Sequence, residues 1–134
     1  PVNQKECISF MERFVGTLGF KSVKIMSPQA HDEIISFTSQ LPHAIAVSLI
    51  NSDNEKYETG KYIGDSYRDL TRIANINENL WSELFLRNSD YLLASIEAFE
   101  EQLDLIKVAL KDNDERLLKD LFIKSSLRRE KLEK

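Results

Sequence analysis

Residues 64–88 contain the side chains whose chemistry is most specific. Arg68, Asp69, Thr71 and Arg72 lie within five positions, and the only tryptophan, Trp81, follows them. Apolar residues surround this cluster, so we expect at least one guanidinium to be partly buried. A buried guanidinium needs an anionic partner, because leaving the charge unpaired is costly. That partner is either an acidic side chain such as Asp69 or a ligand carboxylate, which a planar guanidinium can bind through two parallel hydrogen bonds.

A second polar group lies upstream, within residues 27–51. Apolar positions repeat there at helical spacing, and a serine followed by a proline is typical of a helix start. Pro42 lacks a backbone donor, so we expect a kink near residues 38–41. Four polar residues fall on one face of this helix: Ser36, Ser39, Gln40 and His43. A polar face on an otherwise apolar helix predicts a pocket, although for His43 the sequence alone favours a core histidine beside the proline kink.

The composition bounds the function classes. With 134 residues, 42% of them hydrophobic and 30% charged, the chain suits one globular, soluble domain with a proper core. A net charge of -4 gives no electrostatic case for nucleic acid or an anionic membrane surface. Cys7 is the only cysteine, which excludes an intrachain disulfide and a multi-cysteine metal site, and no other metal-ligand set stands out. We expect no membrane span, no signal peptide and a cytoplasmic location.

Helical spacing dominates the rest of the chain, with one short exception. Alternating apolar and polar residues predict a strand over residues 20–26. Helices are predicted over residues 5–18, 65–74, 78–86, 90–110 and 115–132. One helix and one strand cannot form a sheet, so we interpret residues 1–26 as the end of an α/β domain and residues 27–134 as a helical domain. Because the chain begins with Pro1, we expect it to be a fragment of a longer protein.

Three motifs follow one another along the chain. They are His31-Asp32, then Ser39-Gln40-Leu41-Pro42-His43, then Arg68-Asp69-Leu70-Thr71-Arg72-Ile73-Ala74 with Leu80-Trp81 and Asn88. In order and spacing they resemble the carboxyl-terminal domain of the prephenate dehydrogenase family. The resemblance covers roughly residues 19–129, and the agreement of three motifs makes it specific.

The resemblance implies an all-α dimerisation domain of the 6-phosphogluconate-dehydrogenase C-terminal-like type. The last helix and strand of a truncated Rossmann domain would precede it. The whole enzyme would form a homodimer and oxidatively decarboxylate prephenate to 4-hydroxyphenylpyruvate in tyrosine biosynthesis, with NAD or NADP as cofactor. The missing domain would bind most of the cofactor and carry the family's catalytic histidine. We therefore expect no catalytic residue in this chain and no activity from it alone, and tyrosine is a possible effector.

The resemblance also implies a set of substrate-binding residues: Arg72, His43, Gln40, Ser39, Asp69 and Thr71. Arg72 would hold a substrate carboxylate, with Asp69 orienting the guanidinium and Thr71 supporting it. His43 would line the cleft with the other two residues. Gln40 departs from the family, in which many members have histidine at that position.

Several other interpretations stay open. Arg72 could form a structural ion pair with Asp69, Arg68 could belong to a surface or dimer ion pair, and Trp81 fits a core anchor. His31-Asp32 fits a helix start first and a cleft second. The protein could instead be an arogenate dehydrogenase. A purely structural helical dimerisation module is the remaining possibility, and it would not need Arg72 and His43 on one cleft.

Overall fold

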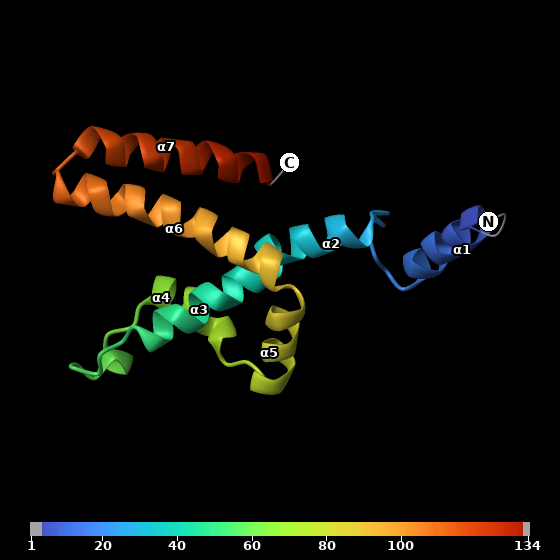
Figure 1. Ribbon diagram of the computed structural model, residues 1–134, viewed down its shortest axis with the longest axis horizontal. Coiled ribbons are helices and arrows are strands. Elements are labelled where there is room, and N and C mark those ends of the chain that lie inside the picture. The colour runs from blue at the N-terminus through green and yellow to red at the C-terminus, as the bar shows by residue number, and fades with distance from the viewer. Residues whose placement is uncertain (1–3, 133–134) are drawn as a thin grey trace. The chain divides into compact units, whose positions relative to one another are not determined.

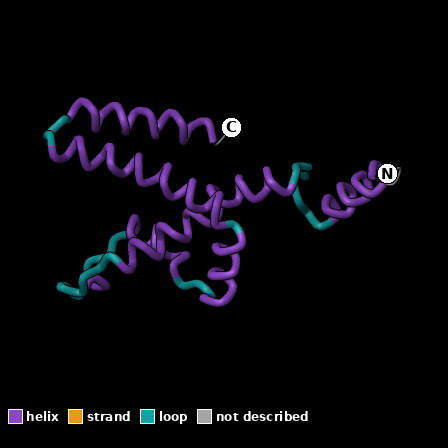
Figure 2. The backbone as a smooth tube through the Cα atoms, in the orientation of Figure 1, coloured by secondary structure: helices purple, strands orange, loops and turns teal. Residues whose placement is uncertain are grey.

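The computed structural model describes residues 4–132, which are helical apart from their connections (Figures 1 and 2). The order of elements is α1 (Gln4–Thr17), α2 (Pro28–Ile35), η1 (Ser36–Gln40), α3 (Leu41–Asn51), η2 (Thr59–Lys61), α4 (Asp65–Thr71), η3 (Arg72–Ala74), α5 (Glu78–Arg87), α6 (Ser89–Lys111) and α7 (Glu115–Leu132). The all-α prediction for the helical domain is confirmed, and the predicted helix boundaries agree with these to within a few residues.

The chain divides into two compact units, Pro1–His31 and Asp32–Lys134. In the first unit α1 ends before Gly19, whose φ of 91° is a conformation that glycine adopts without strain. The strand predicted over residues 20–26 is absent from the described chain. A strand is held by backbone hydrogen bonds to a neighbouring strand, and residues 4–132 supply no such neighbour.

The predicted helix over residues 27–51 forms as three consecutive segments. Ser27 caps α2 by accepting a hydrogen bond from the Ala30 N–H at 3.1 Å, as its position before a proline predicts. The kink expected near Pro42 corresponds to η1, a π-helical turn in which the Leu41 N–H donates to the Ser36 carbonyl. Since Pro42 has no N–H to donate, the helix is interrupted at this point and resumes as α3.

Helix α3 is the element against which the middle of the chain packs. Both α4 and η3 contact α3, while α6 contacts both η1 and α3 (Figure 1). Helix α5 connects η3 to α6 and contacts the start of α6. The motifs at residues 39–43 and 68–74 therefore lie on α3 itself or on elements that contact it.

Helices α6 and α7 form an antiparallel hairpin (Figure 1). Asn113, at the turn, has a φ of 51°, and asparagine tolerates this left-handed conformation better than most residues. Asp114 then caps α7 by accepting a hydrogen bond from the Leu117 N–H at 2.9 Å.

Few large apolar side chains are buried within the chain. Leu41 and Leu92 are each 4% exposed, while Phe99, Leu103 and Phe122 on the hairpin are 36%, 46% and 59% exposed. The apolar residues that repeat at helical spacing along α6 therefore face their own chain only in part. Much of the apolar surface of the hairpin is left for another surface to cover.

Asn77 is expected to contribute measurably to the stability of α5. Its side-chain oxygen accepts a hydrogen bond from the Leu80 N–H at 2.9 Å, which satisfies one of the free donors at the helix start. Asn77→Ala should lower the free energy of unfolding by about 1 kcal/mol in urea denaturation. Asn79→Ala is the matched control, because its amide contacts only Glu78 on the surface of the same helix. Equal losses from the two variants would refute the capping role.

Candidate functional site

The arginine cluster lies on α4 and η3 and is exposed on this chain. Arg68 forms an ion pair with Asp65 at 3.4 Å, and its side chain is 63% exposed. Arg72 is also exposed, and within residues 4–132 its guanidinium makes no ion pair. The expectation that one of these arginines would be partly buried is therefore wrong for the single chain. The apolar neighbours do not cover the cluster, as the 60% exposure of Leu70 shows.

The side chains around Arg72 leave its charge available. Asp69 is exposed and forms no ion pair with Arg72 in the described chain, so neither the structural pair nor the orienting contact predicted for Asp69 is formed here. Thr71 is half-buried, and its hydroxyl donates to the Tyr67 carbonyl at 2.7 Å within the same helix. An exposed guanidinium without an internal partner can bind an external carboxylate without first breaking an ion pair.

His43 is held in a fixed orientation from two sides. Its Nδ1 lies 2.9 Å from the Ser39 carbonyl oxygen, which can only accept, so Nδ1 carries the proton. Its ring stacks on the Trp81 indole with centroids 3.7 Å apart and planes 28° apart. Phe85 contacts Trp81 edge-on, with ring centroids 5.7 Å apart and an angle of 88° between the ring planes. When the imidazole is neutral, Nε2 can therefore accept a hydrogen bond.

Two residues of the predicted polar face, Ser36 and Gln40, are packed inside the chain. Ser36 is 1% exposed, and its hydroxyl donates to the Glu33 carbonyl at 2.7 Å and lies 2.9 Å from the Ser95 hydroxyl. Gln40 is 5% exposed and bonds to the Leu84 carbonyl and the Asn88 amide. These contacts correct the interpretation of the polar face as a pocket lining. Ser36 contacts α6 and Gln40 contacts α5, whereas Ser39 and His43 are only half-buried.

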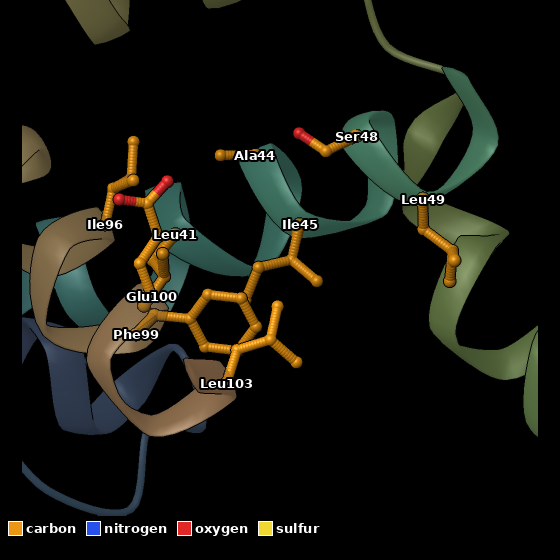
Figure 3. Close-up of a pocket in the computed structure, with 9 residues that line it drawn as sticks. All are labelled: Leu41, Ala44, Ile45, Ser48, Leu49, Ile96, Phe99, Glu100 and Leu103. Carbon is orange, nitrogen blue, oxygen red and sulfur yellow. The ribbon is translucent and has the colours of Figure 1, made fainter. Parts of the chain in front are cut away.

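An apolar groove of about 430 Å³ lies between α3 and α6, away from His43. Figure 3 shows Phe99 and Leu103 of α6 extending toward Ile45 of α3. With 100° between successive residues, Ile45 and the other α3 residues that line the groove face away from His43. The lining residues are Leu41, Ala44, Ile45, Ser48, Leu49, Ile96, Phe99, Glu100 and Leu103. Such a lining suits another apolar surface better than a dianionic substrate.

The connection between α3 and α4 carries a titratable group with a shifted pKa. A hydrogen bond from Thr59 and a second from the Glu55 N–H lower the pKa of Asp53 below its ordinary value. The second bond is 3.0 Å long. The carboxylate is the form that accepts these two hydrogen bonds. They are therefore present near neutral pH and are lost as the pH falls through the lowered pKa of Asp53.

Residues 4–132 contain no group of three or more His, Cys, Asp or Glu side chains placed to hold a metal ion. None of the helices in that range combines the length and the apolar character needed to cross a bilayer.

Sequence reasoning missed the roles of two residues at this site. Trp81 was interpreted as a core anchor, yet it is half-buried and supports His43. Asn88 was recognised only as a motif residue, yet its amide donates to both the Asp32 carbonyl and Gln40. The position of Asn88 between two predicted helices was an available signal, because polar residues there often satisfy free backbone groups.

The fold and site together define a helical domain in which a stacked histidine lies on α3. An exposed arginine lies on η3, which packs on α3. Residues 27–124 match the family described as "Prephenate dehydrogenase, dimerization domain". The chain belongs to this family.

Two dehydrogenases are similar to this chain in sequence. A cyclohexadienyl dehydrogenase of Zymomonas mobilis is 31% identical over 108 residues, which cover 77% of this chain and 37% of that protein. A prephenate dehydrogenase of Bacillus subtilis is 30% identical over 93 residues, covering 66% of this chain and 25% of that protein. This chain therefore spans only about a quarter to two fifths of the length of these relatives.

Solved structures agree in fold. Prephenate dehydrogenase from Aquifex aeolicus in complex with hydroxyphenyl propionate and NAD+ is 32% identical with a TM-score of 0.68, covering 81% of this chain and 40% of that one. A second structure of the Aquifex aeolicus enzyme has a TM-score of 0.80 at 26% identity, covering 96% and 46%. Synechocystis arogenate dehydrogenase, at 21% identity, a TM-score of 0.81 and coverage of 95% and 48%, shows the fold alone.

Proposed function

We propose that this chain is the substrate-binding and dimerisation part of a prephenate dehydrogenase. The whole protein would oxidise and decarboxylate prephenate with NAD or NADP, and the first unit would continue into the nucleotide-binding domain. The observation that carries the proposal is the exposed guanidinium of Arg72 on η3, which packs on the same helix, α3, that carries the oriented imidazole of His43. Family membership supplies the reaction class.

All the predicted substrate-binding residues except the buried Gln40 have a part in this proposal. Arg72 binds a carboxylate of the substrate, and Asp69 approaches the guanidinium once the site is occupied. His43 offers Nε2 to a polar group of the substrate, while its Nδ1 proton stays on the Ser39 carbonyl. Thr71 supports the turn that carries Arg72. Fixing one end of the substrate in this way holds its reacting carbon against the nicotinamide, which converts binding energy into rate.

We propose a homodimer in which the groove between α3 and α6 is covered by the second copy. The groove faces away from His43, so pairing there leaves the candidate substrate site open. A cytoplasmic location and a tyrosine effector stay predictions.

The test of the proposed function is reduction of NAD or NADP by the full-length protein supplied with prephenate or with arogenate. We expect turnover with prephenate, no turnover when the 134-residue chain is assayed alone, and weaker turnover with arogenate. Preference for arogenate would favour the alternative, an arogenate dehydrogenase. The absence of turnover with either substrate would leave only the dimerisation module.

A further inference from the structure

Gln40 occupies a position that joins three elements. It is the last residue of the π-helical turn η1, and its side chain is 5% exposed. Its Nε2 donates to the Leu84 carbonyl of α5 at 3.1 Å, and its Oε1 accepts from Asn88 Nδ2 at 2.8 Å. Both ends of the amide are therefore engaged within the chain.

The bond to Leu84 satisfies a backbone carbonyl that α5 leaves free. In a regular helix this carbonyl would accept from the N–H of residue 88, but the Asn88 N–H turns to the Phe85 carbonyl at 3.3 Å. Asn88 Nδ2 also donates to the Asp32 carbonyl at 2.9 Å. The end of α5 is thus held to η1 by two part-buried hydrogen bonds and to α2 by an exposed one.

The same two helical segments meet again one turn away. Gln40 and His43 are three residues apart along η1 and α3, and Leu84 and Trp81 are three residues apart along α5. Residues at this spacing lie on one side of a helix. The hydrogen bond from Gln40 to Leu84 and the stack of His43 on Trp81 are therefore consecutive contacts across one interface, in which the two segments run in opposite directions.

The two contacts differ in how strictly they fix geometry. A stacked pair of half-buried rings tolerates sliding. A hydrogen bond of a buried side-chain amide instead fixes the distance between donor and acceptor to within a few tenths of an ångström. A shift of α5 by one residue would move Trp81 by 1.5 Å along the axis and by 100° around it. The amide contact therefore decides where the indole lies.

We propose that Gln40 is a positioning residue that fixes α5 so that Trp81 stacks on His43. It acts on the candidate site through Trp81 and contacts no substrate itself, which its burial already prevents. This inference deepens the proposed function, because it assigns the support of the imidazole that we place in the substrate site.

Near-ultraviolet circular dichroism of the 134-residue chain tests the proposal without any ligand. The chain has one tryptophan, so the tryptophan band reports on Trp81 alone. His43→Ala defines the band that remains without a stacking partner. Gln40→Leu, which keeps the bulk but loses the amide, should reduce the wild-type band to about half or less, because the band depends on fixed packing. Gln40→Asn keeps an amide that is one methylene too short to reach Leu84, and should do the same.

Ser36→Ala is the matched control. Ser36 lies on the same π-helical turn and is equally buried, but it bonds to α6 through Ser95 and not to α5. We expect this variant to keep the full tryptophan band, with far-ultraviolet spectra showing that every variant is helical. A full band in Gln40→Leu or Gln40→Asn, or an equal loss in Ser36→Ala, would overturn the positioning role.

A second measurement connects the contact to the site. In the full-length protein with NAD+, Gln40→Leu should weaken binding of hydroxyphenyl propionate about tenfold, close to the effect of losing one hydrogen bond, and Ser36→Ala less than twofold. If the wild-type protein does not bind this compound, the proposed function fails while the spectra still decide the role of Gln40. If Gln40→Leu loses the band but binds normally, the step from Trp81 to the substrate site is refuted.

Discussion

Arg72→Ala in the full-length protein is expected to raise the Michaelis constant for prephenate about 100-fold, the loss that follows when one partner of a charge-assisted bidentate pair is removed. The guanidinium of Arg72 is exposed and makes no ion pair within residues 4–132, so its removal breaks no internal contact of that kind. The melting temperature should therefore stay within about 1 °C of the wild type, since surface substitutions rarely change stability. Steady-state kinetics and thermal melts of the same preparations measure both effects.

Arg68→Ala is the control for charge. Arg68 lies one turn earlier on α4 and is similarly exposed, but its guanidinium is already paired with Asp65. It should change the Michaelis constant less than about twofold, because exposed ion pairs contribute little. Arg72→Lys keeps the charge without the planar fork and should fall between the two, at about tenfold. Similar effects from Arg68→Ala and Arg72→Ala would mean that only general electrostatic attraction acts, and normal kinetics for Arg72→Ala would exclude the carboxylate contact.

The helices were predictable from sequence because each one has a local signal. Ser27 followed by proline, Gly19 with its positive φ, and Asp114 before the last helix all mark helix ends through chemistry that involves only neighbouring residues. The interruption before Pro42 was predictable for the same reason, since a missing N–H affects the preceding turn directly. The strand over residues 20–26 was not, because a strand depends on a partner that periodicity cannot reveal.

The candidate site was predictable as a set of residues but not as an arrangement. The sequence placed Ser36, Gln40 and His43 on one face, yet only the packing of α5 and α6 determines that Ser36 and Gln40 are buried while His43 is half-buried. The burial of Arg72 was overestimated because apolar neighbours in the sequence do not have to cover a side chain. Trp81 and His43 are 38 positions apart, so their stack depends on tertiary packing that no local pattern encodes.

Apolar side chains on the hairpin of α6 and α7 stay exposed in the single chain, among them Leu103 at 46% and Phe122 at 59%. Permanent homodimer contacts are more hydrophobic than the rest of a protein surface, so they cover side chains of this kind. In the proposed homodimer, the second copy would cover the apolar groove between α3 and α6.

Leu103→Glu is accordingly expected to dissociate the dimer. Leu103 lines the groove and is 46% exposed in the single chain, so a partner would bury the new carboxylate without a counter-charge. In a homodimer with two-fold symmetry the contact would be self-complementary, so each substitution would enter the interface twice. The dimer dissociation constant should rise by at least about 100-fold, which corresponds to a few kcal/mol. Sedimentation equilibrium at micromolar concentration should then find a monomer, while far-ultraviolet circular dichroism stays helical.

Leu86→Glu distinguishes a specific interface from a general effect of added charge. Leu86 lies on α5, is 75% exposed and does not line the groove, so the same chemical change there should leave the dimer intact. Equal dissociation by both variants would mean that the interface extends beyond the groove. If the Leu103→Glu protein stayed dimeric, the groove could not be the centre of the interface. Since the groove faces away from His43, the monomeric variant should also keep the near-ultraviolet tryptophan band of the stacked pair. A dimer contact that supported Trp81 directly would instead abolish that band together with the dimer.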